Sequence, residues 1–411
     1  MKREITFIHA ADLHLDSPFK GLSDMPPELF GEMKNSTFEA LHHLVDAAIE
    51  HQVDFVLLVG DLFDNERQSL KAQIRLRNAF ERLQEHGIPV YMSYGNHDFL
   101  KGNVHRVTYP DNVHIFPDET VQSFFYRKNG KPMAKIYGFS YVERSVTENK
   151  TGEFSIEDDD VPFHIAMLHG SVQGNADHAP YAPFTISDML DKNFDYWALG
   201  HIHKRQVLKT EPYIVYPGNT QGRHRKETGE KGCYLVQMTD SGTDISFIPL
   251  HAIEFTALTV DVSDVDDVFQ LEKELLVAGG KLASSTPQLL DVTLISSHEK
   301  LADWQTDGKL ADMIAIINET LTDQTPWQYI FHTSVQVEKK LTSAETAYGE
   351  HFPGELNKTF DETVGAEHLH ELFRHRQARK FLEVPEEEEM MEWKEEARRR
   401  LFDQLLRGGN R

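Results

Sequence analysis

Short apolar runs alternate with longer amphipathic segments over the first 250 residues of the chain. Two of these segments repeat apolar residues at helical spacing. Ser36–Gln52 is the first predicted helix, with Ser36 and Glu39 as a capping box, and Ser69–His86 is the second, with Gly87 placed as its C-cap. The apolar runs predict strands over Ile5–Ala10, Phe55–Val59, Val90–Tyr94, Lys135–Ser140, Phe163–Leu168, Tyr196–Leu199, Ile214–Tyr216 and Tyr234–Met238.

Strand–helix–strand order at this spacing predicts right-handed crossovers and therefore a layered α/β fold. The later strands follow one another without long helices, which indicates a mixed sheet or a sandwich of two sheets. From about Phe255 the pattern changes to strand, helix, strand, helix, strand: Thr256–Val262, Val265–Ala278, Gln288–Ile295, Asp307–Leu321 and Tyr329–Val337. This order predicts a small α+β domain.

The last 65 residues are charged and helical in pattern. We expect helices over Ala366–Leu382 and Pro385–Leu406, the second with an apolar stripe made of Met390, Trp393, Ala397, Leu401 and Leu405. The predicted organisation is therefore residues 1–255, 256–345 and 346–411 as three consecutive units.

Polar side chains follow five of the predicted strands at the point where each strand ends. Carboxyl ends of strands are where open α/β sheets place their sites. Two pairs, Asp12 with His14 and His201 with His203, are spaced so that both side chains leave an extended backbone on the same face. The full set of predicted ligands is Asp12, His14, Asp61, Asn96, His169, His201 and His203.

These residue types suit a pair of divalent cations. Asp61 stands where one carboxylate could bridge two metals, and Asn96 offers a neutral amide oxygen. The mixture of imidazole with carboxylate and amide oxygen favours Mn²⁺, Fe or Zn²⁺ over Ca²⁺. A single Asp-x-His after a strand is usually a turn or a cap, but five such fragments in order, each at a strand end, are hard to obtain by chance. The sequence therefore predicts a two-metal site.

The net charge and the cysteine content limit which substrates and which cellular compartment are expected for this site. The formal net charge is −24, so nucleic acid should be repelled at long range unless local basic patches, bound metals or a partner overcome the repulsion. Cys233 is the single cysteine, which excludes an internal disulfide and fits a reducing compartment. No run of about 18 apolar residues occurs and the first residues do not form a secretory signal. We therefore expect a cytoplasmic protein without a membrane span.

The ordered motifs resemble those of the calcineurin-like metallophosphoesterase superfamily. The stretches Ala11–Ser17, Gly60–Asp64 and Tyr94–Asp98 resemble its SbcD branch, the bacterial DNA double-strand-break nucleases, and within that branch the YhaO type of DNA-repair exonuclease. The resemblance covers residues 1–250 through these motifs and the rest only in length and layout. It implies a calcineurin-like β-sandwich flanked by helices, with a small α+β capping domain and a helical C-terminal extension.

The resemblance also implies a role for each residue of the site. Asp12, His14, Asp61 and His203 would hold one metal, and Asp61, Asn96, His169 and His201 the other, with Mn²⁺ expected and Fe or Zn²⁺ as alternatives. His97 would be the catalytic histidine, and Asp98 would orient its ring and raise its basicity. Archaeal and eukaryotic relatives carry a histidine where this chain has Asp64, which leaves the preference for exonuclease or endonuclease cleavage open.

Basic residues cluster just after the site motifs and are candidates for contacts with phosphate. The alternative is that these are solvated loops with no ligand. The candidate substrate-binding residues are Asp64, Arg205, Asn219, Arg223 and Arg225. Tyr181, in a long loop after His169, could stack on a base or serve the fold.

Three functions fit these observations. The first is a DNA exonuclease or endonuclease acting in repair with an SMC-like coiled-coil ATPase, which the C-terminal helices would grip. The second is a phosphatase or phosphodiesterase for a small phosphoester, which the acidic charge supports. The third is a scaffold with a vestigial site, which the intact ligand set argues against. The resemblance further implies a possible homodimer through core helices, with Ser36–Gln52 as a candidate face, although the same helical pattern also fits packing in the core.

Overall fold

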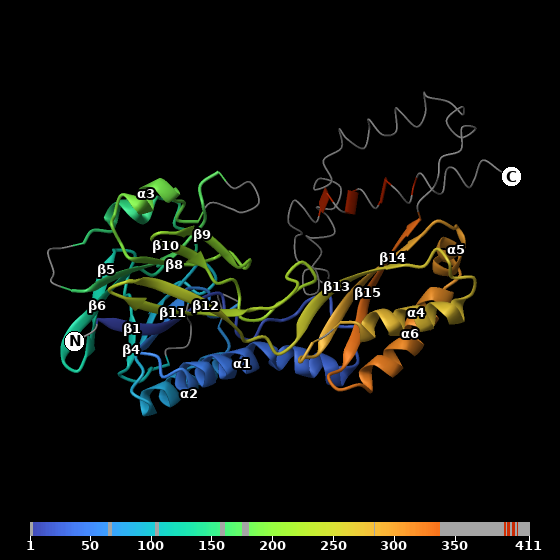
Figure 1. Ribbon diagram of the computed structural model, residues 1–411, viewed down its shortest axis with the longest axis horizontal. Coiled ribbons are helices and arrows are strands. Elements are labelled where there is room, and N and C mark those ends of the chain that lie inside the picture. Colours follow the sequence, from blue (N-terminus) through green and yellow to red (C-terminus); the bar gives the residue numbers. More distant parts are fainter. Residues whose placement is uncertain are drawn as a thin grey trace, which may run out of the picture.

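The computed structural model describes residues 3–64, 68–102, 107–156, 161–174, 181–282 and 284–337, together with single positions between 390 and 401. Its strands form two six-stranded sheets and one three-stranded sheet (Figure 1). The two large sheets face each other as a sandwich, and the small sheet stands to one side with its own helices. This is the predicted α/β class with a sandwich, and the prediction is confirmed.

The first sheet carries three of the strands that lead into the metal motifs. Its order is β12-β11-β1-β2-β3-β4. Strands β1 to β4 are mutually parallel, and β11 runs antiparallel to β1. The bounds are β1 Glu4–Ala10, β2 Phe55–Val59, β3 Val90–Ser93, β4 Val113–Ile115, β11 Gly232–Thr239 and β12 Gly242–Pro249.

The second sheet carries the other two strands that lead into the metal motifs, β7 and β8. Its order is β5-β6-β7-β8-β10-β9, with β6, β7, β8 and β10 parallel to their neighbours and β5 and β9 antiparallel at the edges. The bounds are β5 Gln122–Lys128, β6 Lys131–Gly138, β7 Phe163–His169, β8 Tyr196–Gly200, β9 Gln206–Thr210 and β10 Tyr213–Tyr216. Strands β4, β5, β9 and β12 were not predicted, because each is short or lies partly exposed at an edge and carries a weak apolar signal.

The alternation of side chains along β1 shows how the layers are built. Ile5 and Phe7 point into the space between the two sheets, whereas Ile8 and Ala10 point to the opposite face. Such alternation is the period of two expected of a strand. Because both faces are apolar, β1 is buried on both sides, which is why the run Ile5–Ala10 is almost continuously hydrophobic.

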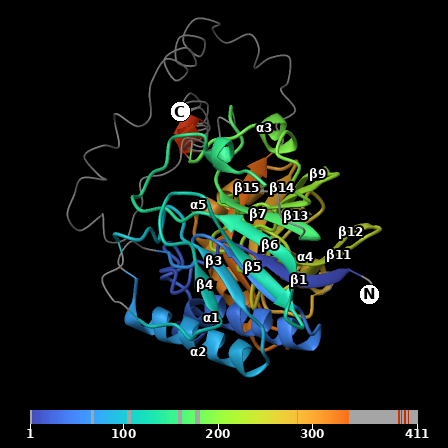
Figure 2. The ribbon, with the colours of Figure 1, turned by 90° about the vertical axis from the view of Figure 1, so that its left-hand side faces the viewer.

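Two helices cover the outer face of the first sheet, where Figure 2 shows them side by side. They are α1 Pro27–Glu50 and α2 Leu70–Glu85. For α2 the predicted start is confirmed, since the Ser69 side chain accepts a hydrogen bond from the Ala72 N–H. For α1 the predicted capping box is wrong. The helix begins nine residues earlier, and Ser36 is a buried interior residue whose hydroxyl donates to the Met33 carbonyl.

The apolar side of α1 lies in the protein's own core. Phe38, Leu41, Leu44, Val45 and Ala48 pack with the first sheet. Residues exposed on the helix are polar or charged, such as His42 and Asp46. The apolar pattern of Ser36–Gln52 is therefore explained by core packing, and a homodimer through this segment would have to use its polar face.

A three-stranded parallel sheet follows, in the order β13-β14-β15. Its strands are β13 Glu254–Asp261, β14 Gln288–Ser296 and β15 Gln328–Val337. Helices α4 Val268–Gly280, α5 Lys300–Thr306 and α6 Lys309–Thr322 pack on it around a separate apolar cluster. The predicted element order is present, with α5 as an additional short helix. We call residues 254–337 the cap.

The cap is joined to the sandwich by a small apolar cluster. Met33 of α1 and the segment before it pack against Phe255, Leu289 and Trp327 of the cap. The Trp327 indole N–H donates to the Glu32 carboxylate at 2.9 Å. The N-terminal extension of α1 beyond its predicted start is what makes this contact possible.

The predicted C-terminal unit, residues 346–411, lies outside the described residues except for the helical positions between 390 and 401. Its predicted helices and its apolar stripe stay predictions. Among the described helices, none is both long and apolar enough to cross a membrane.

Candidate metal centre

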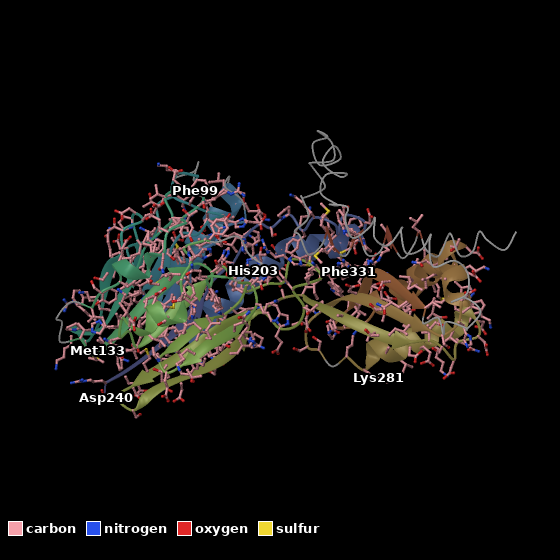
Figure 3. All side chains as sticks on the ribbon, turned by 90° about the horizontal axis from the view of Figure 1, so that it is seen from above. Phe99, Met133, His203, Asp240, Lys281 and Phe331 are labelled. Carbon is pink, nitrogen blue, oxygen red and sulfur yellow. The ribbon has the colours of Figure 1, made fainter. Side chains whose placement is uncertain are left out.

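The carboxyl ends of five strands from both sheets converge on one site. Asp12 and His14 follow β1, Asp61 follows β2, and Asn96 lies just after β3. From the second sheet, His169 ends β7, and His201 and His203 follow β8. Figure 3 places His203 toward the middle of the molecule, between the sandwich and Phe331 of the cap.

The seven predicted ligands form two groups. Potential ligand atoms of Asp12, His14 and His203 lie within 4.8 Å of one another, and so do those of Asp61, His169 and His201. In the first group the Nε2 atoms of His14 and His203 are 3.0 Å apart. In the second, Asn96 Oδ1 lies 3.1 Å from His169 Nε2 and 3.2 Å from His201 Nδ1.

Asp61 lies between the two groups. Its Oδ2 is 3.3 Å from His169 Nε2 in one group and 4.0 Å from His14 Nε2 in the other. Its Oδ1 accepts a hydrogen bond from the backbone N–H of His97 at 2.9 Å, which fixes the carboxylate plane. The Asp61 carboxylate is therefore placed where two cations could share it.

The backbone at the ligands is held in unusual conformations. Asp12, His14, Asp61 and His201 all have positive φ, between 42° and 97°. Non-glycine residues rarely adopt such angles, and each costs on the order of 1–3 kcal/mol. Four such residues at one site indicate that the fold places these side chains where local preference would not.

Two glycines leave the room that the crowded site needs. A Cβ atom at Gly95 would collide with the Asp61 carboxylate and with His169 Nε2. A Cβ at Gly60 would collide with the His169 ring, and Gly60 also has φ of +72°. Any residue with a side chain would therefore force the ligands apart at these two positions.

Hydrogen bonds on the far side of the rings set the tautomers of two histidines. His169 Nδ1 lies 2.9 Å from the Val59 carbonyl oxygen, which can only accept, so Nδ1 carries a proton and Nε2 is the ring nitrogen that faces Asp61. His203 Nδ1 lies 2.7 Å from a carboxylate oxygen of Glu227, so its Nε2 lone pair faces His14 by the same reasoning. Such bonds are typical of histidines that bind metals.

Burial and neighbouring charges set the protonation of the site residues. Burial lowers the pKa of His14 well below its usual value, and burial likewise lowers the pKa of His203, so both rings are neutral and able to donate a lone pair. Burial opposes ionisation of Asp61, yet nearby His169 holds its pKa well below the usual range. Burial raises the pKa of Asp12 well above its usual value, and Asp61 raises the pKa of His169 to about 9 against the effect of burial, so a cation would have to displace protons from these two groups. The donor set of imidazole nitrogen with carboxylate and amide oxygen fits two divalent metals.

His97 lies at the rim of this site. Its ring contacts the His14 ring edge to face, with centroids 5.1 Å apart, and it is partly exposed. Its Nδ1 lies 3.0 Å from the Asp64 carbonyl oxygen, to which it donates. The Nε2 atom of His97 therefore remains for an external group.

The expected pairing of Asp98 with the His97 ring is wrong. The Asp98 carboxylate accepts hydrogen bonds from the backbone N–H groups of Leu62 and Gly95, at 2.6 and 2.7 Å. It is fully buried, and burial, with the charge of Asp61, raises its pKa to about 7. Asp98 joins the loops after β2 and β3, and the Asp64 carbonyl orients His97 instead.

Three of the five candidate substrate residues lie together beside His203. The Arg223 guanidinium forms an ion pair with Asp64 and is largely buried. Asn219 is fully buried and donates to Glu227 at 2.7 Å. Since Arg223 is neutralised by Asp64, it is a structural cation in this arrangement.

The other two candidates point elsewhere. Arg205 is exposed and stacks on the Phe247 ring of β12, with its guanidinium carbon 3.7 Å from the ring centroid. Arg225 lies 3.9 Å from Asp291 of the cap. Tyr181 contacts the His201 ring, with centroids 5.1 Å apart, so it borders the site.

Glu227 was not predicted. Its carboxylate accepts from His203, from Asn219 and from the Arg223 backbone, and it is buried. The sequence offers only an acidic residue directly after the basic stretch Arg223–Lys226, and that signal does not indicate which group it contacts.

The chain is similar in sequence to known metallophosphoesterases. The profile of calcineurin-like phosphoesterases matches residues 5–205. A protein of Bacillus subtilis, named uncharacterized metallophosphoesterase YhaO, is 40% identical over 409 residues, covering 98% of this chain and 99% of that protein. A DNA double-strand break repair protein Mre11 of Methanocaldococcus jannaschii is 30% identical over 262 residues, covering 60% of this chain and 66% of that one. Among solved structures, a dimetal phosphatase from Danio rerio is similar with a TM-score of 0.38 and 12% identity, covering 60% of this chain and 96% of that one.

Proposed function

Since this chain belongs to the calcineurin-like phosphoesterase family, we propose that it is a two-metal DNA nuclease, an exonuclease or endonuclease that hydrolyses phosphodiester bonds during repair. The observation that carries the proposal is the position of Asp61 between two ligand groups, with His97 at their rim. A site of this kind binds a phosphate group and presents a proton donor beside it.

The relatives support DNA as the substrate. Several curated proteins between 22% and 30% identical, over half to two thirds of this chain, bear the name DNA double-strand break repair protein Mre11. The cap and the C-terminal residues beyond the catalytic core add about 155 residues, which a phosphodiesterase for small esters does not need. A larger substrate or a partner would use them.

The residues of the site divide the chemistry between them. Two divalent cations held here would neutralise the phosphodiester charge and supply an activated water. Asp12, Asp61, His14 and His203 would hold these cations, and the first three are buried, where electrostatic interactions are strong. His97, oriented through Nδ1 by the Asp64 carbonyl, presents Nε2 and protonates the leaving oxygen.

We expect Mn²⁺ as the metal, with Fe or Zn²⁺ as alternatives. Each ligand group combines imidazole nitrogen with carboxylate oxygen, and the second adds the Asn96 amide. Mixed nitrogen and oxygen donors suit these ions better than Ca²⁺.

A smaller phosphoester is the second candidate substrate. Its support is electrostatic: the chain has a net charge of −24, and Arg223, a cation beside His203, is already paired with Asp64. DNA would meet a repulsive field at long range, which a small ester tolerates better.

A cleavage assay separates the two substrates. The purified chain is incubated with Mn²⁺ and either end-labelled duplex DNA, end-labelled single-stranded DNA or bis(p-nitrophenyl) phosphate. We expect cleavage of DNA, and loss of that cleavage in Asp61→Asn, which excludes a contaminating nuclease. Hydrolysis of the small ester without cleavage of either DNA would favour the second candidate.

We also propose that the C-terminal apolar stripe binds the coiled coil of an SMC-like ATPase. The described positions 390, 391, 393, 394, 397, 398 and 401 are helical. Of the stripe, Ala397 is exposed and Met390, Trp393 and Leu401 are partly exposed. Trp393→Asp combined with Leu401→Asp in the full chain should abolish co-purification of the ATPase. The matched control is Lys394→Asp on the same helix. Equal recovery of the ATPase by the wild type and the double variant would contradict this proposal.

A further inference from the structure

The loop between β10 and β11 contains a buried carboxylate that belongs to neither ligand group. Glu227 lies in this loop, is 6% exposed and sits behind His203 as seen from the metal site. A carboxylate is buried at a high cost unless hydrogen bonds and charges compensate it. The contacts of the Glu227 carboxylate therefore show which groups compensate the cost of its burial.

Both oxygens of Glu227 are used. One accepts the His203 Nδ1–H at 2.7 Å, and the other accepts the Asn219 side-chain N–H and the Arg223 backbone N–H, each at 2.7 Å. The Arg223 guanidinium lies 3.9 Å away. A carboxylate with donors on both oxygens cannot rotate without breaking hydrogen bonds, so its position is determined.

The bond to His203 has one consistent assignment of the proton. A carboxylate accepts and does not donate, so the proton between the two groups belongs to Nδ1. Arg223 Nη2 also lies 3.3 Å from this nitrogen, but a guanidinium only donates, and two donors do not bond to each other. With Nδ1 protonated, the Nε2 lone pair of His203 points at His14 Nε2, 3.0 Å away.

We propose that Glu227 is a positioning residue that fixes the tautomer and orientation of His203 and strengthens it as a ligand of the metal held by Asp12 and His14. The inference rests on the two-metal site of the proposed function. It does not depend on which phosphoester is cleaved.

The two ligand groups differ in the group that orients one of their histidines. His169 in the other group is oriented by a neutral backbone carbonyl, that of Val59, whereas His203 is oriented by an anion. A carboxylate partner raises the basicity of an imidazole ligand more than a neutral acceptor does. Loss of Glu227 should therefore weaken one metal site and leave the other as it is.

The loop that carries Glu227 is anchored independently of His203. The Gln221 side chain donates to the Ile253 carbonyl at 2.6 Å and accepts from the Ala252 N–H at 2.9 Å, and Gly229 N–H donates to the Phe255 carbonyl at 2.9 Å. These bonds lie on either side of Glu227 along the chain. They hold the loop in place while the carboxylate holds the ring.

The test is a titration of the metal-stripped full chain with Mn²⁺ by calorimetry, with metal content checked by mass spectrometry. Glu227→Gln keeps the side-chain volume, but an amide can satisfy the donors on only one of its two sides. We expect two sites in the wild type, and in the variant one site weakened by about 10- to 100-fold and one unchanged. Glu230→Gln, an exposed glutamate in the same loop, is the matched control and should match the wild type.

A second arm shows whether Glu227 acts through His203. In a His203→Ala chain the further change Glu227→Gln should have no additional effect on Mn²⁺ affinity. An equal loss in both backgrounds, an equal weakening of both sites, or unchanged affinity in Glu227→Gln would overturn the proposal.

A third arm needs no Glu227 variant and applies even if that variant does not fold. Long-range ¹⁵N–¹H spectra of histidine-labelled, metal-free wild type, with the His203 signal identified by its absence in His203→Ala, should show the Nδ1–H tautomer. An Nε2–H tautomer for His203 would overturn the inference.

A wild type that binds two Mn²⁺ but does not cleave DNA would contradict the proposed function and leave the role of Glu227 intact.

Discussion

At the residue scale, the candidate ligands are oriented by groups from neighbouring loops. The Asp12 carboxylate accepts the His201 backbone N–H, with both oxygens within 3.1 Å, and Asp61 accepts the His97 backbone N–H. His169 is held by the Val59 carbonyl. Each loop therefore orients a ligand carried by another. Such preorganisation is what a catalytic metal site needs.

The first prediction concerns His97, which contacts the ligands but belongs to neither group. His97→Ala should retain two bound metals and lose about 10²- to 10⁴-fold in turnover, the usual contribution of a general acid. The measurements are metal content by mass spectrometry and the rate of cleavage of the phosphodiester that the wild type accepts.

The control for this variant is His42→Ala, an exposed histidine of α1, which should retain the wild-type rate. If His97→Ala cleaved as fast as His42→Ala, the proton-donor role of His97 would be wrong.

A second histidine, His9 of β1, gives a prediction about pH. It is fully buried between the sheets, donates from Nε2 to the Leu199 carbonyl and accepts from the Tyr196 hydroxyl, each at 3.0 Å. Burial lowers its pKa to about 3. The unfolded chain takes up a proton on His9 below about pH 6.5 whereas the folded chain does not, so the stability is complete above pH 6.5 and falls with falling pH until about pH 3.

The expected contribution of His9 is about 1.4 kcal/mol of unfolding free energy per pH unit between pH 6 and pH 4. His9→Gln cannot take up this proton, so the free energy of unfolding of the variant should depend less steeply on pH by that amount. Urea unfolding at several pH values measures both slopes, and His86→Gln, an exposed histidine, serves as the control. Identical slopes for His9→Gln and the wild type would contradict the prediction.

At the element scale, the two helices on the first sheet begin in different ways. Helix α2 starts with Ser69, whose hydroxyl caps the Ala72 N–H at 3.0 Å. Helix α1 starts at Pro27 after Pro26, and its first residue relies on the fixed φ of proline without a side-chain cap. Ser36 has the sequence signature of a cap but lies in the middle of a 24-residue helix.

This contrast predicts different effects of the same substitution. Ser69→Ala should lower the free energy of unfolding by about 1 kcal/mol, the usual contribution of an N-cap. Ser36→Ala should change it by less than about 0.5 kcal/mol, because alanine has the best helix propensity and the Met33 carbonyl that loses the serine is within the helix. Urea unfolding of both variants makes the comparison. A larger loss for Ser36→Ala than for Ser69→Ala would contradict the assigned start of α1.

At the scale of the whole molecule, the first turns of α1 link the sandwich to the cap. The linking cluster includes Phe19, Met25 and Met33 on one side and Ile253, Phe255 and Trp327 on the other. The Arg225–Asp291 pair and the Gln221 bonds lie on the same side of the sandwich. The loop of residues 217–231 therefore connects the metal site to the cap in addition to the α1 cluster.

Trp327 is the largest side chain of this cluster, which leads to a prediction about cooperativity. Trp327→Ala removes a nearly buried indole and its bond to Glu32, and should lower the free energy of unfolding by about 3 kcal/mol. Because the cap has its own core, we expect it to unfold at a lower urea concentration than the sandwich in this variant. Far-UV circular dichroism in urea should then show two transitions. Phe269→Ala, an exposed aromatic of the cap, is the control, and a single unshifted transition in Trp327→Ala would contradict the role of the cluster.

The sequence by itself determined the layered α/β class, the strands that lead into the site and the seven polar residues at their ends. Strong apolar runs such as Phe55–Val59 are buried on both faces, so local pattern and final structure agree. Ligands carried by one sheet lie together because its parallel strands share an edge, whereas the meeting of the ligands from the two sheets depends on how the sheets pack. The weak edge strands and the start of α1 were missed, because their signals depend on partners far away in the chain.

The tertiary structure alone decided which neighbour each residue of the site has. Asp98 follows His97 in sequence but bonds to Leu62 and Gly95, and the distant Asp64 carbonyl orients the His97 ring. Glu227 reaches His203 across 24 residues, and Arg223 reaches Asp64 across 159. Such contacts depend on how loops from two sheets fold over one another. A motif of adjacent residues does not indicate how those loops will pack. The residue types of the metal site were therefore legible in the sequence, whereas the hydrogen bonds that orient them were decided by packing.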